Sequence, residues 1–354
     1  MTLANLAHEP VRLIVFGGKD GVGKTTMAAA TALELAKEKK VLLFTTDPAS
    51  SLTDSFNQPI GYEPTPILGS PNLFAIEIDT LKAFRAFKQE HTKDILEILQ
   101  QGTYLSQEEI KDMFSLDLPG MEEMLSFKQI SDSMSGAEYQ VYIVDTAPTA
   151  HTLRLLMLPN LLDSWIKFIA TLRWKYRTVM RAFAGGKNIE KADTFLLGMK
   201  QSVNKVRALL HDASKTEFIV VTTPEKMAMA EAENLLRNLN QLRISTRHII
   251  LNQLFPQEAP EFTALGEIMR TARSRTEGMP PALPFFDSHL NLERYLDFAE
   301  IRRRMQEKYV RGLKEKFGTY TITEVLWQPT EIRGIETLQQ LGSELFMEGG
   351  EMNA

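Results

Sequence analysis

The chain has 354 residues, of which 44% are hydrophobic, enough for one large domain or two coupled ones. Its net charge of −5 gives no overall indication of nucleic-acid binding, and its lack of cysteine excludes disulfides, thiolate metal sites and thiol redox control. The sequence shows neither a signal-peptide pattern nor an apolar stretch of about 18 residues that would span a membrane. We therefore expect a cytoplasmic protein.

The first ten residues have no clear pattern, and we expect them to be loose. A buried strand is predicted at Val11–Phe16, and a helix rich in Ala, Leu, Glu and Lys is predicted at Lys24–Lys39. Between them, Gly18–Thr25 reads GKDGVGKT and fits the phosphate-loop pattern G-x-x-x-x-G-K-[ST]. The predicted cofactor-binding residues of this loop are Gly18, Lys19, Asp20, Gly21, Val22, Gly23, Lys24, Thr25 and Thr26.

The residue types of this loop suit a polyphosphate with Mg²⁺. Glycines let backbone N–H groups face the phosphates without a Cβ in the way, and the positive end of the following helix favours the same anion. Lys24 can reach the β- and γ-phosphates, and the Thr25 hydroxyl can hold Mg²⁺.

Two aspartates follow predicted buried strands. Asp47 comes after Val41–Thr46 and Asp145 after Val141–Val144, so both belong to the carboxyl edge of a parallel sheet, where such sheets bind ligands. We assign Asp145, with Thr25, to Mg²⁺. Taken alone, Asp47 is equally well explained as a turn or helix-cap residue. Further strands are predicted at Leu73–Ile78, Phe218–Thr223, Arg247–Leu251 and Tyr320–Leu326.

Several strings in the chain resemble one family of ATPases. KDGVGKTT, from Lys19, is similar to the KGGVGKTT loop of dimeric ATPases that include the arsenite-pump ATPase ArsA, the tail-anchored-protein targeting ATPase of the GET pathway and the MinD/ParA proteins. DTAPTAHTLRLLMLP, from Asp145, resembles switch II of the ArsA/GET ATPases, which MinD and ParA lack. TDPASSL, from Thr46, resembles switch I of the same ATPases.

The resemblance to the ArsA/GET family implies particular roles. It implies that the nucleotide is ATP, that Lys19 reaches across a homodimer and that Asp47 polarises the attacking water, which makes Asp47, Lys19 and Lys24 the candidate catalytic residues. It also implies that Asn252 reads the adenine, although a turn at a strand end is the alternative. Pro329, in PTEIRGIE, is the other candidate near the adenine.

The expected architecture is α/β: a single P-loop ATPase domain over residues 1–354, with a mostly parallel central sheet flanked by helices. Residues 81–135 and 156–214 would add a helical subdomain for a client or partner. Its helix at Leu161–Ala184 is basic and carries apolar residues on more of its circumference than one core contact needs. A core helix, a client groove and a peripheral membrane contact all remain open for it.

Residues 257–298 are expected to be an atypical insert. In the GET ATPase a C-x-x-C zinc pair precedes the sequence RRxMQxKYL, and Arg302–Val310 matches that sequence here as RRRMQEKYV. Leu296 and Ala299 stand where the cysteines would be, so no zinc is expected.

The favoured function is a dimeric, ATP-hydrolysing switch that targets or holds hydrophobic helices, such as those of tail-anchored membrane proteins. One alternative is the soluble ATPase of an oxyanion efflux pump, although the lack of cysteine disfavours arsenite sensing. The other is a regulatory ATP switch that binds one protein partner without carrying cargo.

Overall fold

In this computed structural model, the described residues are 3–46, 51–78, 130, 133–134, 136, 138–146, 201, 204–205, 207–255, 285–328 and 330–347, with only the backbone described for 285–299. Their strands form one sheet in the order β3-β4-β2-β5-β1-β6-β7-β8. Every neighbouring pair is parallel except β3 with β4, which confirms the predicted mostly parallel sheet. The strands are β1 Leu13–Gly17, β2 Val41–Thr45, β3 Thr65–Ile67, β4 Ser70–Glu77, β5 Val141–Asp145, β6 Thr216–Thr222, β7 His248–Leu254 and β8 Thr321–Leu326.

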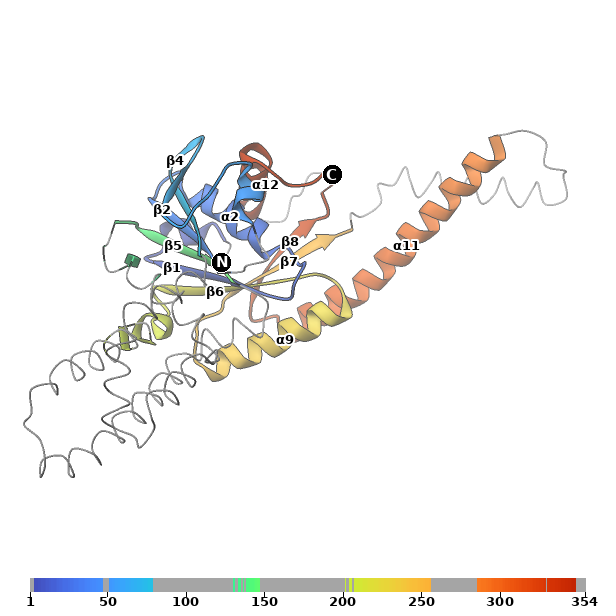
Figure 1. Ribbon diagram of the computed structural model, residues 1–354. Coiled ribbons are helices and arrows are strands. Elements are labelled where there is room, and N and C mark those ends of the chain that lie inside the picture. The colour runs from blue at the N-terminus through green and yellow to red at the C-terminus, as the bar shows by residue number, and fades with distance from the viewer. Residues whose placement is uncertain are drawn as a thin grey trace, which may run out of the picture.

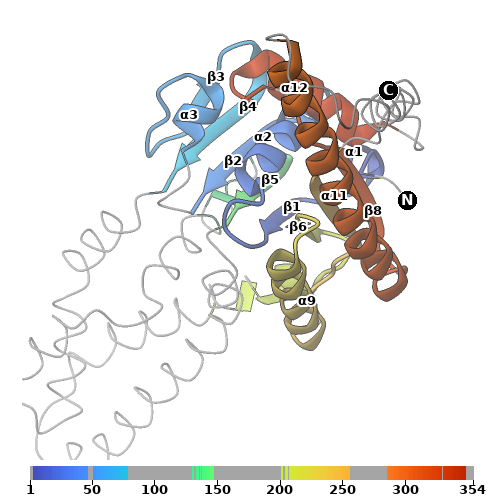
Figure 2. The same ribbon diagram turned by 90° about the vertical axis from the view of Figure 1, so that its right-hand side faces the viewer.

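Helices cover both faces of the sheet. α2 and α12 lie on one face, and α9 lies on the other (Figures 1 and 2). The helices labelled in Figure 2 are α1 Asn5–His8, α2 Lys24–Leu35, α3 Leu52–Phe56, α9 Lys226–Gln241, α11 Phe285–Lys316 and α12 Ile335–Phe346, and residues 207–211 are also helical. The result is a three-layer α/β/α arrangement.

The strand sequences explain the two cores. In β1, Ile14 and Phe16 join the apolar cluster under α2 and α12, whereas Leu13 and Val15 join the cluster under α9. Because both faces are covered, β1 is apolar at nearly every position and buried throughout. A strand that is buried on both faces needs apolar residues at successive positions, and the sequence of β1 shows no polar alternation for that reason.

α12 packs along α2 through a close contact at Gly342. A Cβ placed at Gly342 would lie 2.6 Å from the Ala30 carbonyl oxygen. The two helix backbones are therefore so close that a side chain at position 342 would collide with α2. Leu338, Leu341 and Leu345 of α12 are buried in the same core.

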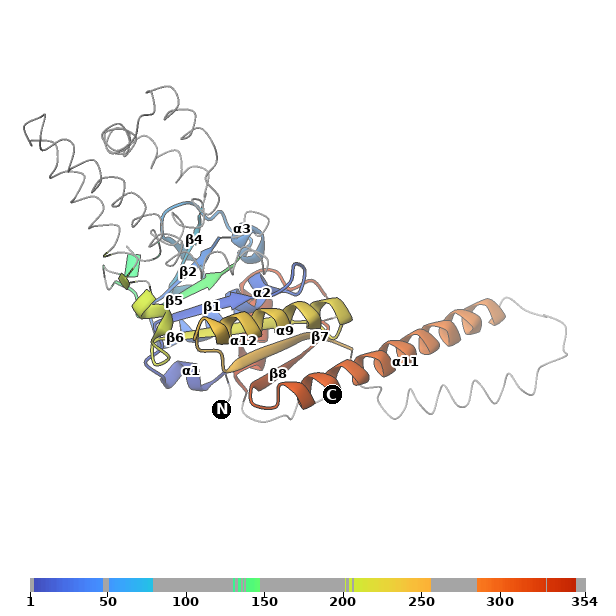
Figure 3. The ribbon, with the colours of Figure 1, turned by 90° about the horizontal axis from the view of Figure 1, so that it is seen from below.

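α11 is one continuous helix over Phe285–Lys316, so residue 298, the expected end of the insert, falls inside it. Its carboxyl-terminal part lies near β8 and α9, and its amino-terminal part extends beyond the sheet (Figures 1 and 3). Leu313 is its buried anchor, in a small cluster with Leu251 and Leu254 of β7.

Several sequence-based expectations need correction. Residues 3–10 are not loose, because Leu3 and Leu6 are fully buried in the core under α2 and α12. α2 ends at Leu35 instead of Lys39, and the Lys39 ammonium instead donates to the carbonyl oxygens of Leu6 and Glu9, both at 3.2 Å. β7 continues to Leu254, so Asn252 lies within the strand and does not follow it.

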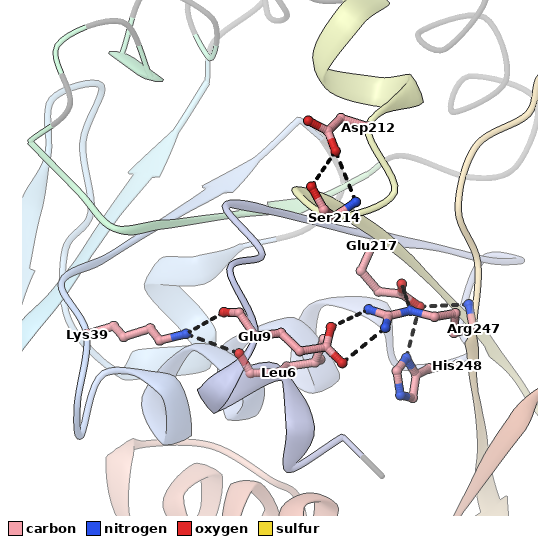
Figure 4. Close-up of polar contacts among 8 residues, drawn as sticks. All are labelled: Leu6, Glu9, Lys39, Asp212, Ser214, Glu217, Arg247 and His248. Atoms are coloured by element: carbon pink, nitrogen blue, oxygen red, sulfur yellow. Dashed lines mark hydrogen bonds and ion pairs between the residues drawn. The ribbon is translucent and has the colours of Figure 1, made fainter. Parts of the chain in front are cut away.

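A partly buried ionic network ties the amino-terminal segment to β6 and β7 (Figure 4). The Arg247 guanidinium binds Glu9 Oε2 at 2.6 Å through Nη2 and Glu217 Oε2 at 2.8 Å through Nε. His248 Nδ1 lies 2.9 Å from Glu217 Oε1, and both side chains are fully buried. Burial alone would raise the pKa of Glu217, but hydrogen bonds from His248 and Arg247 hold that pKa below its usual value.

Replacing Glu217 tests this network. Glu217→Gln keeps the side-chain shape but removes the charge that Arg247 faces, so the free energy of unfolding should fall by about 3 kcal/mol near neutral pH. Since the pKa of Glu217 is lower in the folded state, its stabilisation is present above the ordinary carboxyl pKa and is lost as the pH falls through the folded value. The wild-type advantage should therefore shrink on acidification, as measured by urea unfolding.

Glu138→Gln is the matched control, because Glu138 makes an exposed ion pair with Lys40 at 2.9 Å. That change should cost at most about 0.5 kcal/mol. Equal losses in the two variants, or a Glu217→Gln loss that does not change with pH, would contradict the assigned role of the network.

Candidate functional site

The glycine-rich loop joins the end of β1 to the start of α2. A Cβ at Gly18 would lie 2.2 Å from the Val221 carbonyl oxygen of β6, so only glycine fits there. Gly23, at the amino end of α2, has φ 91°, a left-handed conformation that favours glycine. The loop therefore packs closely against its neighbouring strands, and this contact requires glycine at positions 18 and 23.

Two side chains of β7 hold the loop from outside. Asn252 Nδ2 donates to the Val22 carbonyl at 2.9 Å, and Gln253 Nε2 donates to the Gly21 carbonyl at 3.5 Å. In a planar trans peptide the N–H points opposite to the C=O, so the amides of Val22 and Gly23 point away from β7. Backbone N–H groups held in one direction form a cradle for an anion.

Lys24 is the first residue of α2, and its side chain contacts the loop. Its side chain is almost entirely buried, with 4% of its surface exposed, and its Nζ donates to the Lys19 carbonyl at 3.2 Å. The ammonium is thus held at the loop itself, where a phosphate would be its counter-ion. Lys19 is partly exposed and Asp20 is exposed.

Oxygen atoms from three elements meet beside the loop. The Thr25 hydroxyl of α2 donates to Asp145 Oδ2 at 2.7 Å, and the Thr45 hydroxyl of β2 donates to the same oxygen at 3.1 Å. Hydroxyl and carboxylate oxygens are the ligands that Mg²⁺ prefers, so Thr25 and Asp145 fit a magnesium ion at a bound triphosphate. No larger group of acidic or histidine side chains suited to a metal occurs among the described residues.

The structure brings together most of the predicted site. Gly18–Thr25, Asp145 and Asn252 converge at the carboxyl edge of the sheet. Thr26 is partly exposed in the first turn of α2. Asp47 and Pro329 lie outside the described residues, as does the predicted helix at Leu161–Ala184.

Sequence reasoning missed Thr45 and Gln253. Thr45 ends β2 in register with Asp145 of β5, so aligning the predicted strand ends would have placed its hydroxyl beside that carboxylate. Gln253 has a left-handed backbone, φ 58°, for which its sequence gives no signal because it is not glycine.

A glycine-rich loop between a central strand and a helix, beside a buried carboxylate on the adjacent parallel strand, defines a P-loop nucleoside triphosphatase. The sequence model of one family, described as anion-transporting ATPase, matches residues 11–275 and 289–347. The chain belongs to that family, and it is an ATPase.

Named relatives cover almost the whole chain. ATPase ASNA1 homolog 1 of Paramecium tetraurelia is 32% identical over 345 residues, 94% of this chain and 97% of that protein. ATPase GET3 of Phaeosphaeria nodorum is 29% identical over 347 residues, 95% of this chain and 94% of that protein. ATPase ASNA1 homolog of Dictyostelium discoideum is 28% identical over 354 residues, 98% of this chain and 93% of that protein. The family resemblance predicted from the motifs is confirmed.

Replacing Gly23 tests the fit of the loop against β7. A Cβ there would lie 2.6 Å from Asn252 Nδ2, and a left-handed backbone costs an alanine about 1–2 kcal/mol. Gly23→Ala should therefore weaken Mg·ATP binding about tenfold or more, as measured by calorimetry.

The control is Gly61→Ala, because a Cβ at Gly61 meets nothing within 4 Å. This variant should bind nucleotide as the wild type does. Unchanged affinity in Gly23→Ala would show that the loop does not depend on its contact with Asn252.

Proposed function

We propose that this ATPase is a homodimeric switch of the cytoplasm that captures hydrophobic helices, such as those of tail-anchored membrane proteins, and releases them according to its nucleotide state. The observation that carries the proposal is the similarity, over almost the whole chain, to ATPases named GET3 and ASNA1. Among the described residues no helix is both long and apolar enough to cross a bilayer.

Each group in the site has a separate role in ATP hydrolysis. The loop amides bind the phosphate oxygens, and the Lys24 ammonium exchanges the Lys19 carbonyl for a phosphate. Mg²⁺, when held at Thr25 and Asp145, would neutralise charge on the phosphates. In this proposal Asp47 orients the water that attacks the γ-phosphorus, and Lys19 of each subunit reaches the nucleotide of the other.

The connections of the sheet suggest how nucleotide state reaches a client. β4 ends at Glu77, shortly before residues 81–135, and β5 ends at Asp145, shortly before residues 156–214. Thr146 is fixed because its hydroxyl donates to the Phe16 carbonyl of β1 at 2.7 Å. The proposed client-binding segments therefore follow strands that end at the nucleotide edge, and the Asp145 carboxylate touches both β2 and α2.

A second candidate is the ATPase subunit of an anion pump. The description of the matching family, anion-transporting ATPase, favours it. The two functions differ in what the protein holds. Purification from its native cells would recover a set of single-span membrane proteins for a targeting factor and one multi-span transporter for a pump subunit.

Two substitutions separate nucleotide binding from turnover. Lys24→Ala removes the buried cation of the loop and should abolish measurable ATP binding, because the triphosphate loses its main charged partner. Asp47→Asn should leave ATP binding within about threefold and lower kcat by about 100-fold, a loss of about 2.7 kcal/mol in the transition state. If Asp47→Asn hydrolyses ATP at the wild-type rate, its assignment to the water is wrong.

Client capture is tested on the helix predicted at Leu161–Ala184. Changing Trp165, Ile169 and Leu172 to serine should abolish capture of a tail-anchored segment while ATP hydrolysis persists, since only the apolar surface is lost. The control variant changes Lys167 and Lys175 to serine on the same helix and should capture normally. Unfolding of the triple variant would show instead that these side chains form a core, and unchanged capture would exclude them as the groove.

A further inference from the structure

Gln306 of α11 holds the end of β7 with both ends of its side-chain amide. Its Oε1 accepts a hydrogen bond from the Phe255 N–H at 2.6 Å, and its Nε2 donates to the Phe255 carbonyl at 3.1 Å. This is the pair of hydrogen bonds that a neighbouring strand would supply. Phe255 is the first residue after β7, so Gln306 continues the ordered pairing of β7 beyond the strand itself.

An irregular stretch of β7 ends two residues before Phe255. The register with β8 shifts between Leu251 and Leu254, and Gln253 within that interval has a left-handed backbone with φ 58°. The Asn252 Oδ1 accepts the Gln253 N–H at 2.8 Å. Left-handed backbone at a residue other than glycine is unfavourable and persists only where the surroundings hold it. We refer to Asn252 and Gln253 together as the β7 bulge.

The two side chains of the β7 bulge are those that hold the phosphate loop. Asn252 binds the Val22 carbonyl and Gln253 the Gly21 carbonyl. After the bulge, the Leu254 carbonyl accepts the Trp327 N–H at 2.7 Å, and Phe255 is bound by Gln306. Residues 252–255 thus connect α11 to the phosphate loop, because Gln306 binds Phe255 while Asn252 and Gln253 bind the loop.

α11 makes most of its described contacts with the body on the carboxyl-terminal side of Gln306. Toward its carboxyl end, Leu313 is buried, Lys314 pairs with Glu324 of β8 at 2.6 Å and Lys316 pairs with Glu233 of α9 at 2.6 Å. Toward its amino end, Arg302 lies 4.0 Å from Glu225 at the start of α9, and beyond that residue the helix runs outward past the sheet (Figure 3). Gln306 therefore lies within the part of α11 that contacts the body, close to where the helix leaves it.

We propose that Gln306 is a positioning residue for the nucleotide site. By holding Phe255, it keeps the β7 bulge in the conformation that directs the Val22 and Gly23 amides toward the phosphates. Nucleotide binding and the seating of α11 on β7 are then thermodynamically coupled. Because such coupling is reciprocal, a contact that lifts α11 from Phe255 weakens nucleotide binding to the same extent.

Graded substitutions of Gln306 test the coupling through enzyme kinetics. Gln306→Leu removes both hydrogen bonds, whereas Gln306→Glu keeps an acceptor for the Phe255 N–H and loses the donor to its carbonyl. We expect the KM for ATP to rise about tenfold in Gln306→Leu, equivalent to about 1.4 kcal/mol, with a smaller fall in kcat and an intermediate KM in Gln306→Glu. Lys308→Gln, at an exposed neighbour on α11, should match the wild type.

A purely structural role for Gln306 predicts a different result, namely a lower melting temperature with an unchanged KM for ATP. That outcome, or a wild-type KM in Gln306→Leu, would overturn the proposal.

Amide hydrogen exchange on the wild-type protein gives a second test that does not depend on any variant folding. Mg·ADP should slow exchange at residues 301–310 of α11 as well as in the phosphate loop. Exchange in 301–310 that is the same with and without Mg·ADP would also overturn the coupling.

Discussion

The phosphate loop can bind an anion only if its backbone amides face the ligand while its carbonyls find partners elsewhere. Asn252 and Gln253 meet the second condition, because they bind the carbonyls of Val22 and Gly21 from the adjacent strand. Close packing at Gly18 and Gly23 restricts the backbone conformation of the loop. The rest of the sheet serves this arrangement, because β1 must lie between β5, which supplies the metal-site carboxylate, and β6, against which the loop packs.

The carboxyl and amino ends of the strands differ in the interactions that they make. At the carboxyl edge, Asp145 is buried and yet touches hydroxyls on both α2 and β2, so this edge is polar, crowded and suited to respond to a nucleotide. At the amino ends of β6 and β7, the ion pairs among Glu9, Arg247 and Glu217 join segments that are far apart in the chain. These ion pairs thus lie away from the edge that has to change during turnover.

Sequence reasoning succeeded where the signal is local. The loop motif, the buried strands and the family strings lie within short windows, and the structure or the comparisons confirm them. It failed for α1, whose four residues are too few to show a helical period, and for the Glu9–Arg247 contact, because nothing local marks residues 238 positions apart as neighbours. Thr45 and Gln306 also act through partners far along the chain. The roles of Asp47 and Pro329 stay predictions, since both lie outside the described residues.

The central claim is that the state of this nucleotide site controls the capture of a hydrophobic helix. The direct measurement is the affinity of the full-length wild-type protein for a fluorescent tail-anchored segment, without nucleotide, with Mg·ADP and with a non-hydrolysable Mg·ATP analogue. The account predicts that capture is at least tenfold tighter in one of these states than in another, about 1.4 kcal/mol of coupling. Equal affinity in all three states, or no capture in any, would contradict it.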